Sequence, residues 1–336
     1  MRTEIENTFG IDARCRELVT YESEEGLREA LTRIRNQYGE TPLLHVGCGS
    51  NLLFLHDYEG IVLKSEIKGI DIKAETGDDV LVEVGAGEIC DDFIACAIRR
   101  GWYGMENLSL IPGQIGAAAV QNIGAYGVEV CDVIEEVHGI SLADSASHSW
   151  KQEDCSYGYR SSIFKEELWG KYAITRVTFR LSKRFVPKLQ YGGLVKAVEQ
   201  SGLTEDTLTA DQLRQIIIDI RRTKLPDPKE QGNAGSFFKN PVVSTEIAAQ
   251  LLSRYPSMPH YPAEDGKVKL AAGWLIEQAG WKGRSLGPAA VHDRQALVLV
   301  NRGGATGRDI QRLQEAIQED VYKQFGIELS PEVNLI

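Results

Sequence analysis

A glycine- and alanine-rich segment, Ile111–Gly127, constrains the fold of this chain more than any other stretch. It reads IPGQIGAAAVQNIGAYG, with Gly or Ala recurring every two or three residues. Such a backbone can lie flat against a large ligand, because few side chains keep the two apart. Gln121 and Asn122 add hydrogen-bond donors and acceptors, and Tyr126 adds a hydroxyl on an aromatic ring. A tightly packed structural crossover would explain the glycines but not the Gln-Asn pair, so the sequence favours a binding segment.

A second small-residue segment, Gly47–Leu52 (GCGSNL), follows a short apolar strand predicted over Leu43–Val46. Its backbone N–H groups and the side chains of Ser50 and Asn51 offer the convergent donors that phosphate oxygens require. It matches neither GxGxxG nor a Walker loop, and by itself it is explained more simply as a glycine-rich turn. Together with Ile111–Gly127, it fits a dinucleotide whose pyrophosphate lies along backbone amides.

Composition limits the classes of function. At 336 residues the chain can hold two or three domains, and 43% hydrophobic with 25% charged residues is ordinary for a globular protein. The net charge of −11 argues against binding to nucleic acid or an anionic membrane, although a local cluster of Arg and Lys can still bind an anionic substrate. No apolar run approaches the ~20 residues of a membrane-spanning helix, and the N-terminus lacks a signal-peptide pattern.

The cysteines and histidines indicate neither disulfides nor a metal. The six cysteines are scattered without a CxxC pair, which is typical of reduced thiols in the cytoplasm. The six histidines lie far apart and form no HExxH motif. The sequence therefore predicts a cytoplasmic protein without a metal site.

Helical and strand patterns occur in two blocks. In the first block, Ser23 can cap a helix that runs to Tyr38. Between 183 and 210 the pattern weakens into turns and short polar pieces, until Thr209 and Gln212 form a capping box ahead of another helix. Further strands are predicted at 61–63, 80–84, 133–140, 173–181 and 296–301, and further helices at 91–100, 245–254, 270–279 and from 306 onward. This mixture predicts an α+β protein of at least two domains.

The decapeptide Gly232–Pro241 (GNAGSFFKNP) places one hydroxyl, that of Ser236, between glycines and two aromatic residues. The glycines let a ligand approach the backbone, and Phe237 and Phe238 can keep water out. Such a serine can act as a nucleophile, a hydrogen-bond donor or a proton donor. These roles imply different enzymes.

Other charged and aromatic residues each allow two interpretations. Arg160, in CSYGYRSSIF, suits a carboxylate, or it stacks on a tyrosine at the surface. The basic run Arg221–Lys229 either complements the C-terminal end of its helix or binds a diphosphate. Tyr191 is either a lid aromatic or a core residue. Glu332, in SPEVN, is by itself a solvated carboxylate.

The ordered set of motifs resembles the UDP-N-acetylenolpyruvoylglucosamine reductases (UDP-N-acetylmuramate dehydrogenases, MurB), flavoenzymes of bacterial cell-wall precursor synthesis. The resemblance runs from Asn7 to Val333, and the segments around Tyr191 and 254–262 resemble the subclass with an extra substrate-covering loop. The motifs are IPGQIGAAAVQNIGAYG, YGYRSSIFK, TKLPDPK, GNAGSFFKNP, KLAAGWLIEQ and AAVHDRQALVLVN.

The resemblance implies an FAD-binding domain of the vanillyl-alcohol-oxidase (PCMH) type and a C-terminal α/β substrate-binding domain. It places the first domain at 1–183 with a subdomain boundary near 69, a connecting loop with the substrate-covering tyrosine at 184–210, and the second domain at 211–336. The implied cofactor is noncovalent FAD, with NADPH as the hydride-donating cosubstrate. We expect a monomer that acts on a small-molecule substrate.

The implied reaction reduces the enolpyruvyl ether of UDP-N-acetylglucosamine to UDP-N-acetylmuramate. Hydride attack on the β carbon places carbanion character on the α carbon, delocalised into the carboxylate as an enolate. Arg160 would pair with this carboxylate, and Glu332 would polarise it, best when protonated or through a water, since two nearby anions repel each other. Ser236 would give its proton to the α carbon.

By the same resemblance, FAD contacts are expected at Gly47, Cys48, Gly49, Ser50, Asn51, Leu52, Ile111, Pro112, Gly113, Gly116, Ala117, Gln121, Asn122, Gly124, Ala125 and Ile174. Substrate contacts are expected at Tyr126, Tyr159, Tyr191, Arg221, Lys224, Asn240 and Gln278.

Three rival classes compete with the reductase. A flavin oxidase on the same fold would reoxidise in air without an enolpyruvyl substrate. A serine hydrolase built on Ser236 would need a base, for which His292 and Asp293 are available, although the sequence lacks GxSxG. A non-catalytic nucleotide-sugar binding protein would have no use for a flavin.

Overall fold

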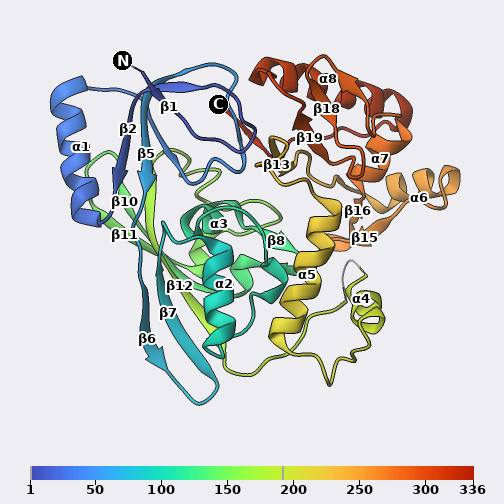
Figure 1. Ribbon diagram of the computed structural model, residues 1–336, viewed down its shortest axis with the longest axis horizontal. Coiled ribbons are helices and arrows are strands. Elements are labelled where there is room, and N and C mark those ends of the chain that lie inside the picture. The colour runs from blue at the N-terminus through green and yellow to red at the C-terminus, as the bar shows by residue number, and fades with distance from the viewer. Residues whose placement is uncertain (1, 191–192) are drawn as a thin grey trace. The chain divides into compact units, whose positions relative to one another are not determined.

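The computed structural model describes residues 2–190 and 193–336, and its elements are labelled in Figure 1. The chain forms two compact units. The first contains the N-terminal segment up to Glu4 with Cys15–Cys48 and Glu59–Arg221, and the second contains Ile5–Arg14, Gly49–Tyr58 and Arg222–Ile336. The units thus differ from the expected domain limits at 183 and 210, because they divide within helix α5 (Ala210–Lys224).

Two N-terminal segments belong to the second unit because they pack into its core. Phe9 and Leu53, one from each segment, are fully buried there. Gly307 allows a close approach, since a Cβ at this position would lie 1.8 Å from the main-chain oxygen of Phe54. Such packing between distant parts of the chain leaves no local pattern in the sequence.

The first unit contains a sheet in the order β1-β2-β5-β3, formed by Thr3–Glu4, Arg14–Tyr21, Tyr58–Ser65 and Leu43–Val46. Helix α1 (Glu24–Tyr38) packs Leu27 and Leu31 against Ile61 of this sheet. The Ser23 hydroxyl accepts a hydrogen bond at the N-terminus of the helix, and Gly39 ends it with φ 64°. The predicted helix and its cap are confirmed.

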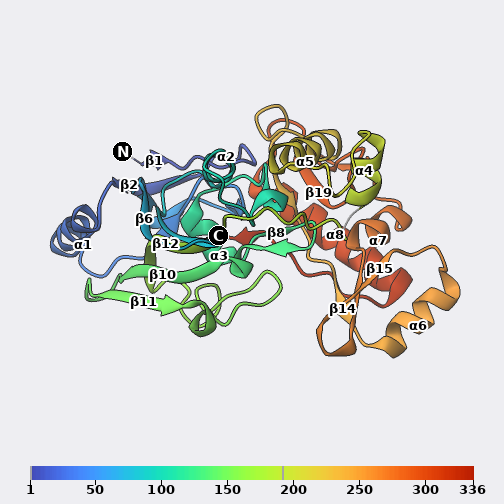
Figure 2. The ribbon, with the colours of Figure 1, turned by 90° about the horizontal axis from the view of Figure 1, so that it is seen from below.

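A larger sheet in the first unit is antiparallel and has the order β11-β10-β12-β7-β6. Helices α2 (Cys90–Arg99) and α3 (Ile115–Gln121) lie in front of β7 and β12 in Figure 1, and Figure 2 shows β12, β10 and β11 side by side. Phe93 of α2 stacks on Phe179 of β12 with ring centroids 5.4 Å apart. The strands, in the same order, are Ser147–Lys151, Ile134–Ser141, Tyr172–Ser182, Asp79–Gly85 and Ile70–Glu75.

Residues 183–210 are more regular than their sequence pattern predicts. They include helix α4 (Leu194–Gln200), which lies beside α5 in Figure 1. The buried side chains of Leu189, Leu194 and Leu208 pack against Ile217 of α5. The helix leaves a weak sequence signal because only Leu194 and Val198 of its seven residues are buried. The prediction of turns and polar pieces was therefore wrong for α4.

The capping box predicted before α5 is confirmed. Thr209 N donates to Gln212 Oε1 at 2.9 Å, and Gln212 N donates back to Thr209 Oγ1 at 3.3 Å. The first unit also contains a short hairpin of β8 (Gly124–Ala125) and β9 (Val128–Glu129) and three 3-10 turns at Glu106–Leu108, Val130–Asp132 and Gln152–Cys155.

The second unit contains a sheet in the order β13-β19-β18-β17, formed by Asn233–Ser236, Val298–Asn301, Ala289–Val291 and Ser285–Leu286. A smaller sheet, β14-β16-β15, comprises Val242–Val243, Val268–Leu270 and His260–Pro262. The C-terminal strand β20 (Asn334–Leu335) pairs in parallel with β4 (Leu52–Leu53).

The helices of the second unit are α6 (Thr245–Arg254), α7 (Ala272–Gln278) and α8 (Gly307–Phe325), with a 3-10 turn at Glu264–Gly266. Thr306 and Asp309 form the capping box of α8, which confirms the predicted last helix. Helix α7 is shorter than predicted because Leu270 belongs to β16. Helices and antiparallel sheets together confirm the α+β class. Throughout 2–190 and 193–336, every helix falls short of the length and apolarity needed to cross a membrane.

Candidate active site

The two small-residue segments meet in the first unit. A Cβ on Gly47 would lie 3.2 Å from Gln114 Oε1 and 3.3 Å from the Cβ of Ala117. Residues 115–121 do not lie flat, as their composition suggested, but form α3. The glycines serve close packing instead: a Cβ on Gly116 would lie 2.9 Å from the Cβ of Ala86. A larger residue at 116 would force a shift of the neighbouring backbone, and one at 47 would be tightly packed.

A third small-residue segment, Gly85-Ala86-Gly87, joins the other two and was absent from the expected contacts. A Cβ on Gly85 would lie 2.3 Å from the main-chain oxygen of Ile67. Gln114 Nε2 donates to the main-chain oxygens of Gly87 and Ser65, both at 3.1 Å. The signal in the sequence was a Gly-Ala-Gly directly after the β7 pattern.

Gln121 and Asn122 differ in how their side chains are used. Gln121 Oε1 accepts from Lys165 Nζ at 2.7 Å, while its Nε2 is buried and has no hydrogen-bond partner among the described residues. A buried amide donor of this kind is costly unless a ligand satisfies it. Asn122 is fully buried, and both ends of its side chain bind other protein groups.

The remaining expected cofactor residues of the first unit lie around α3 and β12. Ile111, Pro112 and Gly113 form the turn before α3, where Gly113 O accepts from Cys90 N at 3.0 Å. Cys48 follows Gly47, and Gly124 and Ala125 form β8. Ile174 of β12 is a buried core residue. The side chain of Ile174 therefore contributes packing.

Gly49, Ser50, Asn51 and Leu52 belong to the second unit. Gly49 has φ 64°, and a Cβ there would lie 2.5 Å from the main-chain oxygen of Glu6. Asn51 Nδ2 donates to the main-chain oxygen of Glu332 at 3.3 Å, and Leu52 pairs with Asn334 between β4 and β20. The C-terminal tail thus fixes this end of the loop.

Arg160 occupies a tight turn in the first unit. Gly158 and Ser161 exchange main-chain hydrogen bonds of 3.1 and 3.0 Å, with Tyr159 and Arg160 between them. Arg160 has φ 58°, which is unusual for a residue with a Cβ. Its guanidinium donates to the main-chain oxygens of Asn122 and Gly124, and its Cζ lies 5.3 Å from the Tyr159 ring.

Arg221 lies on α5 in an electrostatic cluster. The pKa of Arg221 lies below its ordinary value, mainly because the side chain is buried. Tyr126 and Asp91 oppose this shift, and the positive charge of Arg160 adds to it. Its Nε is buried and, within the described part of the chain, has no hydrogen-bond partner. Lys224 is exposed three residues further on, so both cations lie on one face of α5.

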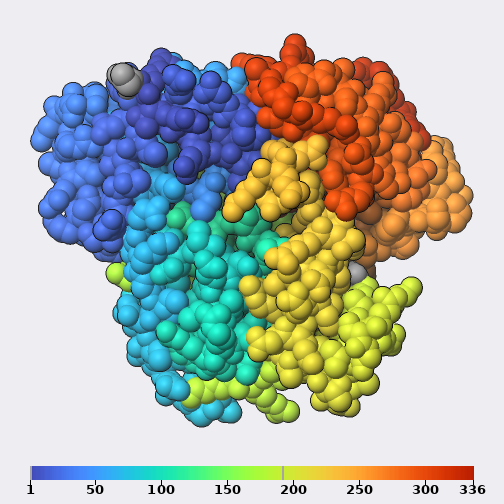
Figure 3. All heavy atoms as spheres, in the orientation of Figure 1, coloured from blue at the N-terminus to red at the C-terminus, as the bar shows by residue number. Residues whose placement is uncertain are grey.

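An ion pair beside this cluster joins α2 to α5, whose surfaces adjoin in Figure 3 (teal and yellow). Both guanidinium nitrogens Nη1 and Nη2 of Arg214 donate to Asp91, the second at 3.0 Å. Although burial alone raises the pKa of Asp91, hydrogen bonds from Arg214 and Leu110 N hold that pKa below its ordinary value. Leu110 has φ 60°, and this bond fixes it just before the Ile111 turn.

Ser236 ends strand β13 of the second unit. Asn233, only 2% exposed, holds the preceding turn: its Oδ1 accepts from Gly235 N at 2.9 Å. Phe237 and Phe238 are fully buried and pack edge-to-face with ring centroids 5.2 Å apart. The aromatics therefore anchor the backbone in the core, whereas the sequence suggested that they shield a ligand.

Glu332 lies on a segment that pairs with residues 237–239, which directly follow Ser236. Its main-chain N donates to Phe237 O at 2.7 Å, and Lys239 N donates to Ser330 O at 2.9 Å. An isolated bridge joins Phe238 to Pro331. The structure thus brings the backbones around Ser236 and Glu332 together within one unit.

The other expected substrate residues are more dispersed. Asn240 Oδ1 accepts from Ala272 N at 3.0 Å, at the start of α7. Gln278 is exposed at the other end of α7, about 9 Å along the helix axis. Tyr126 is partly buried against the side chains under α4, with φ 50°. Tyr191 lies outside the described residues.

His292 is the base that a serine hydrolase would need. It is 6% exposed, and its Nδ1 lies 3.3 Å from the main-chain N of Gln295, which donates to it. Burial lowers the pKa of His292. No hydrogen bond joins its ring to Ser236 in the part of the chain that the structure describes, so the geometry does not favour a Ser-His pair.

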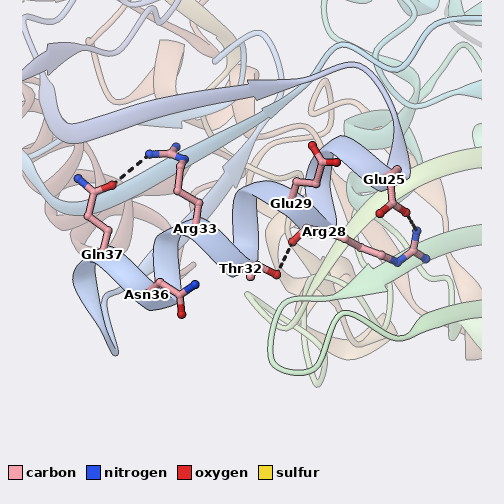
Figure 4. Close-up of a pocket in the computed structure, with 7 residues that line it drawn as sticks. All are labelled: Glu25, Arg28, Glu29, Thr32, Arg33, Asn36 and Gln37. Atoms are coloured by element: carbon pink, nitrogen blue, oxygen red, sulfur yellow. Dashed lines mark hydrogen bonds and ion pairs between the residues drawn. The ribbon is translucent and has the colours of Figure 1, made fainter.

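A pocket on α1 is separate from all these residues (Figure 4). The Thr32 hydroxyl donates to the main-chain oxygen of Arg28 at 2.9 Å, and Arg28 pairs with Glu25 over 3.9 Å. The side chains satisfy one another along a single helix, as on an ordinary solvated face. The lining residues are Glu25, Arg28, Glu29, Thr32, Arg33, Asn36 and Gln37.

Comparison with known proteins relates both units to one family. Residues 16–146 match the FAD binding domain family, and residues 227–336 match UDP-N-acetylenolpyruvoylglucosamine reductase, C-terminal domain. The UDP-N-acetylenolpyruvoylglucosamine reductase of Bacteroides fragilis strain YCH46 is 50% identical over 330 residues, which cover 98% of this chain and 97% of that protein. The chain belongs to the UDP-N-acetylenolpyruvoylglucosamine reductase family.

Further reductases of this family are similar over the same span. The one from Burkholderia multivorans is 48% identical, covering 97% of this chain and 93% of that protein. The crystal structure of UDP-N-acetylenolpyruvylglucosamine reductase (MurB) from Thermus caldophilus, 24% identical, covers 100% of this chain and 98% of that chain with a TM-score of 0.69, and shows the same fold. The expected PCMH-type FAD-binding domain and the C-terminal domain of this family are confirmed, and the chain is an FAD-dependent oxidoreductase.

The residues of the first unit fit a bound FAD. Because Gly47 lacks a side chain, its main chain packs closely against Gln114 and Ala117 at the start of α3. The unpartnered Nε2 of Gln121 supplies a donor at the end of α3. We take Gly47, the Ile111–Gly113 turn, Gly116, Ala117 and Gln121 as the residues of this unit that would hold it.

Proposed function

We propose that this protein reduces the enolpyruvyl ether of UDP-N-acetylglucosamine to UDP-N-acetylmuramate, a peptidoglycan precursor, with NADPH as the electron source. The proposal rests on membership of the reductase family and on the residues that the two units present. The observation that carries it is the pairing of the Glu332 segment with residues 237–239, which directly follow Ser236.

Bound FAD, reduced by NADPH, supplies the hydride that the β carbon of the enolpyruvyl group receives. Arg160 binds the carboxylate of that group, because a guanidinium offers two parallel donors to a planar anion. Negative charge moves onto this carboxylate during hydride transfer, so its interaction with Arg160 strengthens in the transition state. Glu332 polarises the same carboxylate, either in its protonated form or through a water, because two nearby anions would repel each other.

Ser236 donates the proton that the α carbon needs to complete the reaction. A serine hydroxyl is a poor acid in water, so it must be held in a fixed position in a dry site. The buried Phe237 and the turn held by Asn233 provide a rigid backbone on both sides of Ser236. The Ser236 side chain itself is partly exposed and can face a substrate.

The diphosphate and sugar of the substrate are assigned to residues outside the reacting centre. Arg221 and Lys224, on one face of α5, suit the diphosphate, and the buried Nε of Arg221 is an unused donor in the described chain. The residues assigned to the sugar and to closure over the substrate are Tyr126, Tyr159, Tyr191, Asn240 and Gln278.

Spectroscopy of the purified protein tests the proposal. The protein should be yellow, should lose its flavin absorbance on anaerobic addition of NADPH, and should regain it when the enolpyruvyl nucleotide is added. Denaturation should release the flavin, since it is held noncovalently. Rapid reoxidation in air without the nucleotide would indicate a flavin oxidase, and a colourless protein would indicate a nucleotide-sugar binder.

A further inference from the structure

Asn122 lies at the junction between the flavin-binding segment and the turn that carries Arg160. It follows the last residue of α3 and has φ 48° and ψ 63°, the left-handed conformation that asparagine tolerates better than most residues. Its side chain is fully buried in the first unit. The family resemblance assigns this residue to the cofactor, but its contacts point to a different task.

The side chain of Asn122 makes three hydrogen bonds within the protein. Its Nδ2 donates to Glu129 Oε2 at 2.8 Å and to the main-chain oxygen of Gly158 at 2.9 Å. Its Oδ1 accepts from the main-chain N of Cys131 at 3.2 Å. An asparagine amide has two N–H donors, and both are used here. The side chain therefore has no donor left for a cofactor.

Two of the contacts of Asn122 bear directly on Arg160. Gly158, which accepts from the Asn122 side chain, is the first residue of the turn that holds Arg160 in its left-handed conformation. The guanidinium in turn donates to the main-chain oxygens of Asn122, at 3.5 Å, and Gly124. The side chain of Asn122 thus contacts the backbone turn, and its main-chain oxygen contacts the charged end of the arginine.

The segment after Arg160 reinforces this arrangement. The Ser162 hydroxyl donates to the main-chain oxygen of Val120 at 2.6 Å, and Lys165 reaches Gln121. The last carbonyls of a helix have no partners within it, and Ser162 satisfies that of Val120, whereas Lys165 donates to the side-chain oxygen of Gln121. The arginine turn and the end of α3 form one hydrogen-bonded structure.

We propose that Asn122 is a positioning residue that orients Arg160 toward the carboxylate of the substrate. This inference rests on the proposed function, because it assumes that Arg160 binds that carboxylate. It predicts that loss of the Asn122 side chain weakens recognition of the carboxylate while binding of FAD, of the nucleotide and of the sugar is retained.

Two variants and two ligands test the proposal. Asn122→Gly removes the side chain and suits the left-handed backbone, whereas Asn122→Asp keeps the shape but replaces the donor with an anion facing Glu129. UDP-N-acetylmuramate carries the carboxylate, and UDP-N-acetylglucosamine has the same nucleotide and sugar without it. Calorimetric titration of the flavin-loaded proteins should show about 10-fold or more weaker binding of the first ligand and less than about twofold change for the second.

Two further variants distinguish a failure of the positioning role of Asn122 from a failure of the proposed role of Arg160. Cys131→Ala alters a neighbouring side chain but keeps the main-chain N that Asn122 accepts from, and should bind both ligands as the parent protein does. Arg160→Met should lose affinity for the carboxylate ligand alone. If it does, and the Asn122 variants weaken both ligands equally or neither, the positioning role is refuted. If Arg160→Met itself does not distinguish the ligands, the proposed role of Arg160 fails, and the inference with it.

Discussion

Two buried asparagines, one in each unit, hold the turns next to Arg160 and Ser236. Asn122 is 0% exposed and Asn233 is 2% exposed, so both amides must find protein partners. Asn233 Nδ2 donates to the main-chain oxygens of Gln231 at 2.8 Å and Pro226 at 3.3 Å, and its Oδ1 accepts from Gly235 N. Each asparagine uses both ends of its side chain.

The two differ in the distance along the chain over which they act. The partners of Asn233 lie within seven residues of it, so the serine turn is organised largely by its own segment. Asn122 reaches Gly158, 36 residues away, so the arginine turn acquires its shape only when β10 and β12 have assembled. The serine turn is held mainly by its own segment, whereas the arginine turn is held by groups distant in the chain, and the following variants test this difference.

The largest expected effect concerns the serine site and is confined to one half-reaction, the reduction of the substrate. Ser236→Ala should slow reduction of the enolpyruvyl substrate by at least ~10³-fold, because a proton donor is lost, and leave reduction of the flavin by NADPH nearly intact. Stopped-flow absorbance of the flavin measures both steps. Ser236→Thr keeps a hydroxyl and should retain more activity. Equal slowing of both half-reactions would contradict the proton-donor role.

The next effect tests the local asparagine. Asn233→Ala leaves the carbonyls of Pro226 and Gln231 and the N–H of Gly235 without their partner. The free energy of unfolding should fall by about 3 kcal/mol, since buried polar groups lose hydrogen bonds. Urea unfolding of the intact chain measures this loss, which should appear in the transition of the second unit. An unchanged midpoint would show that the serine turn does not depend on Asn233.

A histidine in the first unit should make stability depend on pH. Burial lowers the pKa of His45 to about 4 from its ordinary 6.5, and its Nε2 lies 2.6 Å from the Tyr21 hydroxyl. Between these values the unfolded chain binds a proton that the folded chain does not, so stability is full above pH 6.5 and falls as the pH falls toward 4. At pH 5 the loss should be about 2 kcal/mol relative to neutral pH.

Urea unfolding at pH 7 and pH 5 measures this loss. His45→Gln, which keeps a polar side chain near Tyr21 but does not titrate, is the matched variant and should lose less stability between the two pH values. The same difference in both proteins would mean that other groups cause the pH dependence.

The smallest effect probes the arginine site. A Cβ on Gly124 would lie 2.8 Å from Arg160 Nη1, 3.0 Å from Glu129 Cγ and 3.0 Å from the main-chain oxygen of Val128, so Gly124→Ala should displace the guanidinium and shift the β8–β9 hairpin slightly. We expect kcat/KM for the enolpyruvyl substrate to fall about 10-fold, as a charged hydrogen bond is weakened, with flavin reduction unchanged. Steady-state kinetics on both substrates shows the outcome. A change confined to the NADPH step would place Gly124 with the cofactor instead.

The sequence predicted those elements whose ends are marked by local chemistry. Ser23, Thr209 and Thr306 each cap a helix that the structure contains, because a hydroxyl at such a position satisfies the first free N–H groups. The strand Leu43–Val46 was predicted to the residue. It did not predict α4, whose apolar residues are few, nor the packing role of Gly85–Gly87.

For the candidate site, the sequence predicted which residues take part but not how their neighbours pack. The resemblance assigned Ser236, Arg160 and Glu332 to the site, and the structure pairs the backbone at Glu332 with that at Phe237, next to Ser236. The burial of Phe237 and Phe238 was not foreseen, because an aromatic residue beside a glycine-rich turn has the same signature whether it covers a ligand or anchors the core.

What the sequence determined by itself is the family and the chemistry that its motifs carry, since residue types and short spacings are enough to specify caps, turns and reactive groups. The tertiary structure alone decided which polar side chains already have hydrogen-bond partners within the protein. Asn122 and Gln121 are neighbours of similar chemistry, yet one amide has two protein acceptors while the other has an unpartnered buried donor among the described residues. That difference depends on groups brought from elsewhere in the chain, which no local pattern records.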